Sequence, residues 1–366
     1  MEAIASTKMK KLLLCLSSIV LAVGVCGGPL LLRLYFLRGG HRIWFSSWLQ
    51  TAGFPIIFMP LLLSYHRRRC GGESPRNTTA LFQISPCLSI CAALIGVLVG
   101  ADNYAYSYGV AKLPVSTSSL VTATQLAFTA GFAFLLVKQK FTAFSVNAVV
   151  LLTLGAVVLG VHAGSDRPNG ESKNAYTVGF VLTVAAAALY GLILPLVELS
   201  YAKAKQTVSL GLVLEYQLIM GFVATVISTV GMLINQDFEA IPREARESEL
   251  GEAKFYTLIV GSVIVWQFFF VGAVGVISFG SSLLSGVIIT VLLPVTEVFA
   301  VIFYHEKFQA EKGISLFLSI WGFASYSYGE IKQMKKPKQL PLSVETQMMT
   351  PRTSTSTAVV PSHQTV

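Results

Sequence analysis

The sequence predicts an all-α membrane protein with ten transmembrane helices, arranged as two inverted five-helix repeats. Only 12% of the 366 residues are charged and 54% are hydrophobic, whereas a soluble domain has roughly 25% charged residues. Apolar segments of about 20 residues, the length that crosses a bilayer, recur along the chain. In addition, positions in the second half repeat positions in the first. A soluble fold is excluded, because one domain of this size cannot enclose so much apolar surface.

The expected spans follow one another with mostly short connections. They are residues 12–33, 43–64, 83–109, 115–137, 142–162, 177–200, 208–234, 255–280, 283–304 and 312–330. The resulting organisation is an N-terminus (1–11), a first repeat (12–162), a linker (163–176), a second repeat (177–330) and a tail (331–366). The tail is rich in Lys, Ser, Thr and Pro and is expected to be disordered. The first span is expected to be retained, because no cleavage site follows it.

The distribution of Lys and Arg sets the expected orientation. With the N-terminus in the cytoplasm, sixteen Lys and Arg residues lie inside and eleven lie outside. That bias favours cytoplasmic termini, and it places the linker and the long acidic connection 235–254 outside. We expect no nucleic-acid partner despite the formal charge of +9, because the basic residues form short clusters between spans.

Matching residues in the two halves indicate an internal repeat. Pro29 and Pro195 are 166 residues apart, as are Gly109 and Gly275. Further matches at offsets of 167 or 168 pair Trp48 with Tyr216, Gly53-Phe54 with Gly221-Phe222, Lys140-Phe141 with Lys307-Phe308, and Gly155 with Gly322. Because each half holds five spans, an odd number, the halves must have opposite orientations. Inverted repeats are typical of secondary transporters, so we interpret the chain as a solute carrier.

A few polar and aromatic side chains interrupt the spans at one depth, between the midplane and the outer surface. Gln50 is one of them, and the expected substrate-binding residues are Trp44, Trp48, Asn103, Tyr106, Gln125, Trp266 and Gln267. Polar groups inside a membrane are costly when unsatisfied, so this cluster indicates a shared cavity. No Lys or Arg lies at this depth, so a phosphate or carboxylate would lack a counter-ion. Aromatic rings and amides suit a flat, neutral heteroaromatic ligand.

Each of these residues also has a purely structural explanation. Trp44 lies close to the outer boundary, where tryptophans form an aromatic belt. The two glutamines could hydrogen-bond between helices, and Asn103 could cap or bridge helices. Tyr106 follows Asn103 by three residues and shares its helix face, so it is the tyrosine that we expect in the cavity.

Four carboxylates within or near the spans are the candidates for proton coupling and gating. Glu297 is the favoured proton-coupling residue, because it follows Pro294, which loosens its helix. A carboxyl in a partly dry cavity holds its proton more readily than one in water, so it can exchange the proton near neutral pH. Alternatively, neighbouring hydroxyls and amides hold Glu297 permanently. Asp102 is the second coupling candidate, and Glu215 and Glu198 are expected gate or boundary residues.

Several motifs resemble those of the plant purine permeases. They are Cys26-Gly27-Gly28-Pro29-Leu30, Arg33-Leu34-Tyr35-Phe36, Gly39-Gly40, Arg42-Ile43-Trp44, Thr51-Ala52-Gly53-Phe54-Pro55, Gly100-Ala101-Asp102-Asn103-Tyr104, Tyr106-Ser107-Tyr108-Gly109, Leu113-Pro114-Val115-Ser116-Thr117, Ser118-Ser119-Leu120 and His305-Glu306-Lys307-Phe308. The resemblance covers about residues 9–330. It implies the drug/metabolite transporter fold, with two inverted five-helix repeats around a central site. It also implies proton-coupled uptake of adenine and related bases, including cytokinins, and we expect this in the plasma membrane.

Other functions remain as alternatives at this point. Some members of the resembled family carry pyridoxine or alkaloids, which are also flat heteroaromatic molecules. A passive channel would differ from a carrier in lacking saturable, gradient-dependent flux. An intramembrane enzyme would need a motif such as H-E-x-x-H or G-x-S-x-G, and the sequence has neither. The five histidines lack metal-ligand spacing, so we expect neither a metal nor a cofactor; nothing in the sequence indicates the oligomeric state.

Overall fold

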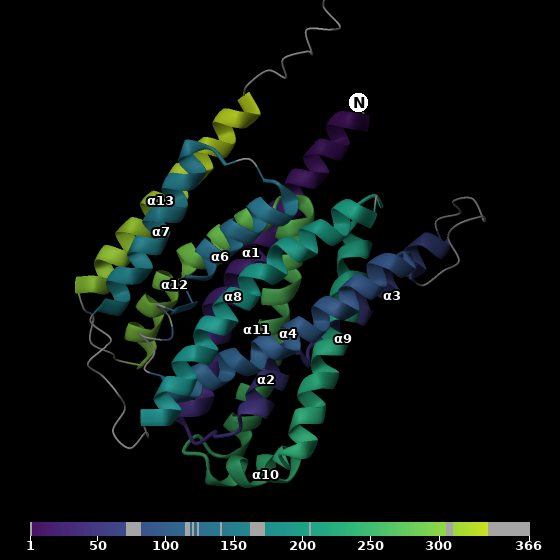
Figure 1. Ribbon diagram of the computed structural model, residues 1–366. Coiled ribbons are helices and arrows are strands. Elements are labelled where there is room, and N and C mark those ends of the chain that lie inside the picture. The colour runs from purple at the N-terminus through teal and green to yellow at the C-terminus, as the bar shows by residue number, and fades with distance from the viewer. Residues whose placement is uncertain are drawn as a thin grey trace, which may run out of the picture.

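Figure 1 shows the computed structural model, which describes residues 2–70, 82–113, 118, 121–122, 124–139, 141–161, 173–204, 206–304 and 310–335. Its elements are α1 (Glu2–Leu37), α2 (Ile43–Thr51), η1 (Phe54–Ile57), α3 (Phe58–Cys70), α4 (Pro86–Lys112), α6 (Gln125–Phe132), η2 (Ala133–Val137), α7 (Ala143–Val161), α8 (Lys173–Ala204), α9 (Leu210–Ile234), α10 (Asp237–Glu247), α11 (Glu252–Phe279), α12 (Ser282–Tyr304) and α13 (Ala310–Lys335). No strand occurs within the described residues. The prediction of an all-α protein is confirmed.

Six helical segments of the described chain are long and apolar enough to cross a bilayer. They are Lys8–Leu37, Ile43–Leu63, Pro86–Lys112, Asn174–Ala204, Leu210–Ile234 and Glu252–Phe279. Shorter apolar helices cover Gln125–Val137, Ala143–Gly155 and Ser282–Thr296. The outer surface of the bundle is apolar too, since Leu94, Leu135 and Phe317 are 63% or more exposed. Such a surface fits lipid rather than water, as expected for a multi-pass membrane protein.

The second expected span, 43–64, is interrupted in the structure. α2 ends at Thr51, and the short 3-10 helix η1 precedes α3. Pro55 has no N–H to bond the carbonyl of Thr51, so the α-helical pattern fails at this point. The backbone N–H of Ile56 instead donates to the Gly53 carbonyl at 3.0 Å. The corresponding stretch of α9, around Gly221, lacks a proline and is continuous.

Two other boundaries differ from the expectation. The polar connection 235–254 contains the helix α10, which begins with the acidic residues Asp237 and Glu239 in its first turn. Acidic groups stabilise a helix at its N-terminus. α13 continues to Lys335, beyond the expected boundary at residue 330. Residue 162, the first part of the expected linker (163–172) and the rest of the tail (336–366) lie outside the described residues.

The helices pack in pairs that position the centre of the bundle. α1 lies along α11, α4 along α8, and α7 along α13 (Figure 1). α12 packs against α1, and α6 packs against α8. We call the end where α1 begins and α8 ends the N-terminal end, at the top of Figure 1, and the opposite end the α10 end. The largest cluster of buried hydrophobic side chains contains residues from α1, α4, α8, α9, α11 and α12.

Candidate functional site

A small cavity lies in the centre of the bundle, between α1, α2, α4, α6, α8, α11 and α12. Its volume is about 60 Å³. The lining residues are Val25, Pro29, Gln50, Asn103, Tyr106, Thr122, Gln125, Tyr190, Trp266, Phe269, Phe270, Ile289 and Leu293. Four of the expected substrate-binding residues, and Gln50 from the same depth, therefore meet at one place. No charged side chain is among the described lining residues.

Three of the lining residues carry buried hydrogen-bond donors that find no partner in the described part of the chain. The side chains of Asn103, Gln125 and Trp266 are at most 4% exposed. Within the described part of the chain, Asn103 Nδ2, Gln125 Nε2 and Trp266 Nε1 have no hydrogen-bond partner. A buried donor without a partner costs about 1–3 kcal/mol. A ligand that offers acceptor atoms in this cavity would remove that cost.

Gln50 occupies a fixed position beside these donors. Its Nε2 donates to Ser107 Oγ at 2.8 Å, and the carbonyl oxygen of Asn103 is 3.5 Å away. These contacts join the short helix α2 to α4. Through these contacts Gln50 holds α2 against the segment of α4 that contains Asn103.

Aromatic rings form the walls of the cavity. The rings of Tyr106 and Trp266 meet edge to face, with centroids 6.1 Å apart. Trp266 also contacts Phe269 at 5.4 Å, and Tyr190 contacts Phe269 at 5.8 Å between centroids. The sequence analysis did not single out Tyr190, Phe269 or Phe270. Phe269 could have been found, because it follows Trp266 by three residues and shares its helix face.

The structure does not bring the other three expected substrate-binding residues into this cavity. Trp48 is directed toward α9, where its Nε1 donates to Thr229 Oγ1 at 3.2 Å. Trp44 stacks on Tyr104, with ring centroids 4.1 Å apart, and lines a separate pocket at the α10 end. Gln267 lies against Gly53 at the break after α2. Neither amide atom of Gln267 has a hydrogen-bond partner within the described residues.

The two expected coupling carboxylates lie on different helices. Asp102 is 6% exposed on α4, and its Oδ1 has no partner among the residues that the structure describes. It does not line the cavity. Glu297 lies on α12, three residues after Pro294, and its side chain is outside the described part of the chain.

The two expected gate residues hold the beginnings of other helices at the N-terminal end. Glu215 Oε2 accepts hydrogen bonds from the backbone N–H groups of Gln83, at 2.8 Å, and Ile84, at 2.7 Å. Glu198 Oε2 accepts from the N–H of Ser282 at 2.6 Å. The amides of Gln83 and Ile84 lie just before α4, and Ser282 is the first residue of α12. A negative charge is favourable at the N-terminus of a helix. Glu215 and Glu198 therefore join α9 to α4 and α8 to α12.

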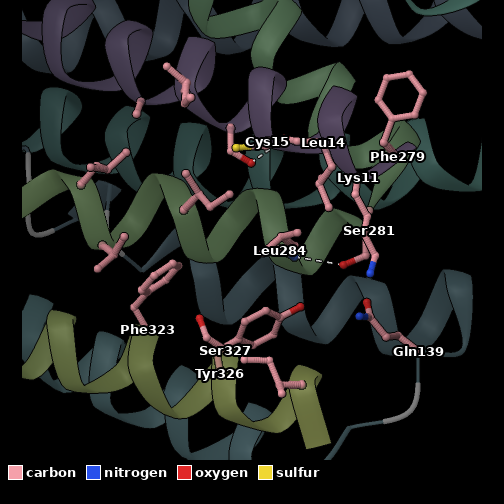
Figure 2. A pocket seen from close by; sticks show the side chains of 18 residues that line it. Lys11, Leu14, Cys15, Gln139, Phe279, Ser281, Leu284, Phe323, Tyr326 and Ser327 are labelled. Atoms are coloured by element: carbon pink, nitrogen blue, oxygen red, sulfur yellow. Dashed lines mark hydrogen bonds between the residues drawn. The ribbon is translucent and has the colours of Figure 1, made fainter. Parts of the chain in front are cut away.

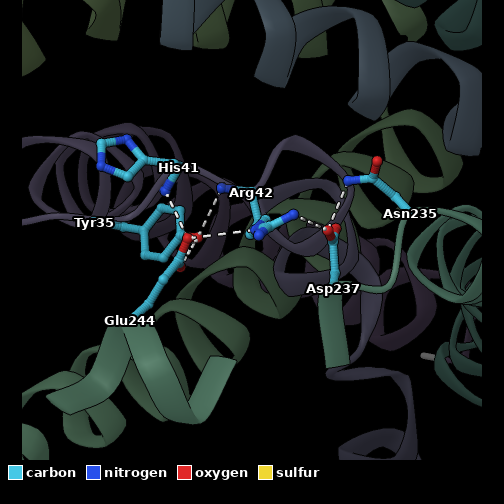
Figure 3. Close-up of polar contacts among 6 residues, drawn as sticks. All are labelled: Tyr35, His41, Arg42, Asn235, Asp237 and Glu244. Atoms are coloured by element: carbon cyan, nitrogen blue, oxygen red, sulfur yellow. Dashed lines mark hydrogen bonds and ion pairs between the residues drawn. The ribbon is translucent and has the colours of Figure 1, made fainter. Parts of the chain in front are cut away.

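A network of charged side chains closes the α10 end, and the sequence analysis missed it (Figure 3). Glu244 accepts from Tyr35 Oη at 2.8 Å and from the backbone N–H of His41 at 3.1 Å. Arg42 lies between Glu244 and Asp237, at 3.8 Å and 3.5 Å. Asp237 also accepts from Asn235 Nδ2 at 2.7 Å.

Comparison with known proteins identifies the family. The family model described as purine nucleobase transmembrane transport matches residues 12–336. Purine permease 3 of Arabidopsis thaliana is 58% identical over 332 residues, which are 91% of this chain and 94% of that protein. Purine permease 2 of the same plant is 53% identical over 342 residues, 90% of this chain and 95% of that protein.

A solved crystal structure gives an independent comparison of the fold. One protein superposes with a TM-score of 0.57 over 84% of this chain and 97% of its own chain, at 14% identity. At that identity the match shows the fold alone. The family match, by contrast, covers nearly the whole described chain and concerns transporters, not enzymes. The chain therefore belongs to the purine permease family of purine nucleobase transmembrane transporters.

Proposed function

We propose that this transporter imports adenine and related purines, including cytokinins, and binds them in the central cavity. The observation that carries the proposal is the set of three buried donors, on Asn103, Gln125 and Trp266, around one aromatic-walled cavity. The edge of a purine carries several nitrogen acceptors that can satisfy such donors. A flat face of the base suits the ring of Tyr106, which meets Trp266 edge to face, because stacking of a base on an aromatic side chain contributes about 1–3 kcal/mol.

Charge further narrows the substrate class. The described lining of the cavity holds no Lys, Arg, Asp or Glu. A nucleotide would place its phosphate in a dry site without a counter-ion, which is unfavourable. Neutral bases avoid that cost, so they are favoured over their phosphorylated forms.

The size of the cavity implies movement during transport. A cavity of about 60 Å³ is far below the roughly 300–1,000 Å³ of typical ligand pockets. Substrate binding therefore requires the surrounding helices to separate. In the proposed mechanism two inverted five-helix repeats rock against each other, opening the cavity to one side at a time.

Matched contacts between the helices support the inverted repeat. A Cβ atom on Gly109 would collide with Thr183, and one on Gly275 would collide with Ser17. Gly275 follows Gly109 by 166 residues, and Ser17 precedes Thr183 by 166 residues. Likewise, Thr129 lies against Gly191, and Thr296 Oγ1 lies 3.4 Å from the Val25 carbonyl oxygen. Thr296 follows Thr129 by 167 residues, and Val25 precedes Gly191 by 166 residues. An inverted repeat accounts for these paired contacts, because it would place matching residues of the two halves at equivalent interfaces.

Protons are the proposed driving ion, and Glu297 is the proposed carrier of the proton, with Asp102 second. The position of Glu297 after Pro294 supports this choice, and the partnerless Oδ1 of Asp102 within the described chain keeps it as the second candidate. In this mechanism the carboxyl binds a proton, and the carrier changes conformation with the proton and the base both bound. Loss of the proton on the cytoplasmic side then weakens binding of the base. The proposed location is the plasma membrane, with both termini in the cytoplasm.

Uptake of labelled adenine into proteoliposomes tests the binding site. Asn103→Ala and Gln125→Ala should each raise KM by about tenfold, equivalent to ~1.4 kcal/mol. Leu94→Ala, on the lipid-facing side of the same helix as Asn103, should leave KM unchanged. An unchanged KM in both amide variants would contradict the proposed site, and non-saturating flux would indicate a channel instead.

A pH gradient tests the coupling residue. Glu297→Gln should abolish accumulation of adenine against its gradient while adenine exchange across the membrane continues. Asp102→Asn is tested in parallel. Full gradient-driven accumulation by Glu297→Gln would remove Glu297 from the coupling role.

A further inference from the structure

A groove opens on the membrane-facing side of the bundle, apart from the central cavity. It lies between α1, α12 and α13 and has a volume of about 850 Å³ (Figure 2). Gln139, which precedes α7, and Ser281, which precedes α12, lie at one end of it. Because helices begin and end there, this end of the groove lies at the membrane boundary, at the N-terminal end of the bundle. The exposed residues Ile19 and Phe323 line the groove, so it is open to the hydrocarbon.

The groove changes from polar to apolar along its length. Lys11, Ser281 and Gln139 lie together at one end, whereas Phe323 lies toward the other (Figure 2). The apolar part is lined by Leu14, Ile19, Ala22, Leu284, Ile288, Val291 and Leu292. From Lys11 to Ala22 the helix rises about 16 Å, close to half of the roughly 30 Å hydrocarbon core. The groove therefore has the length and polarity of one lipid in a single leaflet.

The charge at the polar end selects the headgroup. Lys8, Lys10 and Lys11 are exposed, and no Asp or Glu is among the described lining residues. The ion pairs found in the described chain do not include Lys11. Gln139 adds an amide whose oxygen has no partner among the described residues; this acceptor suits a headgroup hydroxyl, and the phosphate is left to the lysine. A cation with an amide and a hydroxyl at a membrane boundary fits an anionic phospholipid headgroup.

We propose that this groove binds one anionic phospholipid, with its phosphate at Lys11 and an acyl chain along α1 and α12, and that this lipid sets the rate of transport. α12 separates the groove from the central cavity: Ile288 and Leu292 face the groove, whereas Ile289 and Leu293 line the cavity. An acyl chain in the groove packs against the outer side of α12 and thereby stabilises the wall of the cavity. The effect on transport rests on the proposed function of that cavity; the binding of lipid does not.

Photo-crosslinking tests the binding site on the full-length protein in nanodiscs. The probes are phosphatidylglycerol and phosphatidylcholine, each with a photoreactive acyl chain. The expected result is labelling of peptides from α1, α12 and α13, stronger with phosphatidylglycerol. Lys11→Gln should lower phosphatidylglycerol labelling about fivefold, the effect of one basic contact. Lys8→Gln makes the same charge change outside the groove and should have little effect.

Several results would overturn the proposal. Equal labelling by the two lipids would show that the groove does not select an anionic headgroup. Equal losses in Lys11→Gln and Lys8→Gln would indicate only general attraction of anionic lipid to the basic surface. Crosslinks between two copies of the chain through α1 and α13 would assign the groove to a dimer interface. Labelling of the groove by a photoreactive purine would assign it to substrate.

A second variant connects the groove with transport. Ile288→Trp should fill the groove, abolish labelling by both lipids, and remove any acceleration of adenine uptake by phosphatidylglycerol. Persistent acceleration in this variant would contradict the regulatory role. Normal lipid labelling together with absent purine transport under all conditions would overturn the proposed function while leaving the lipid site intact.

Discussion

The two ends of the bundle hold their helices together by different chemistry. At the N-terminal end, Glu215 and Glu198 accept hydrogen bonds from backbone amides at 2.6–2.8 Å. At the α10 end, Arg42 lies between the carboxylates of Glu244 and Asp237 at 3.5–3.8 Å. Glu215 is fully buried, whereas the side chain of Arg42 is 36% exposed.

This difference affects how readily each end can open. A carboxylate bonded to the first amides of a helix has short, directional contacts and a favourable interaction with the helix dipole. The Arg42 contacts are longer, and although Asp237 and Glu244 are buried, the arginine side chain is 36% exposed, so water and salt weaken its attraction to them. We therefore expect the α10 end to open at lower cost than the N-terminal end. Under the proposed orientation, that end faces the outside.

The largest expected effect is at Glu215. Glu215→Ala leaves the amides of Gln83 and Ile84 without their acceptor, and hydrogen bonds to a charged group are worth about 1.5–3 kcal/mol each. The purified variant should have a markedly lower Tm, measured by thermal shift in detergent. Glu247→Ala removes an exposed glutamate at the C-terminal end of α10; it is the control and should melt as the wild type does. An unchanged Tm for Glu215→Ala would show that water replaces the carboxylate.

A smaller loss is expected at the α10 end. Glu244→Ala removes the acceptor of Tyr35 and His41, but the adjacent pocket of about 440 Å³ admits water to the released donors. The expected cost is about 1–3 kcal/mol, and the fall in Tm should be less than for Glu215→Ala. The reverse order of the two melting temperatures would contradict the comparison between the ends.

The smallest effect is the response to salt. Raising ionic strength shortens the Debye length from about 10 Å at 0.1 M to about 3 Å at 1 M, so it weakens the Arg42 contacts and spares the Glu215 contacts. Wild-type protein and Glu215→Ala should both lose a little stability as NaCl is added. Arg42→Gln should respond less, because its own ion pairs are already absent while the exposed Arg38–Glu249 pair at the same end still responds. An equal salt response in Arg42→Gln would assign the effect to other charges.

The sequence predicted four of the cavity residues because their depth in the membrane follows from their position in a span. Asn103, Tyr106, Gln125 and Trp266 all meet at one level. Depth does not specify the direction in which a side chain points. Successive residues of an α-helix point about 100° apart, so Trp266 lines the cavity while Gln267 faces Gly53, beyond the end of α2.

The networks at the ends of the bundle lay beyond sequence reasoning for a related reason. Arg42 and Glu244 are about two hundred residues apart, and α10 brings them together. In the sequence, residues 235–254 are a polar connection whose charges carry little orientation information. Only the packed position of α10 against α9 and α11 buries Asp237 and Glu244 and makes them structural.

By itself, the sequence determined that this chain is all-helical and crosses a membrane several times, and to which family it belongs. These properties follow from local hydrophobicity and from motifs read along the chain. The tertiary structure decided which polar groups share a cavity, which carboxylates hold helix ends, and where α2 breaks. Those features depend on the rotation of each helix about its axis, and that rotation is set by close packing against helices distant in the sequence.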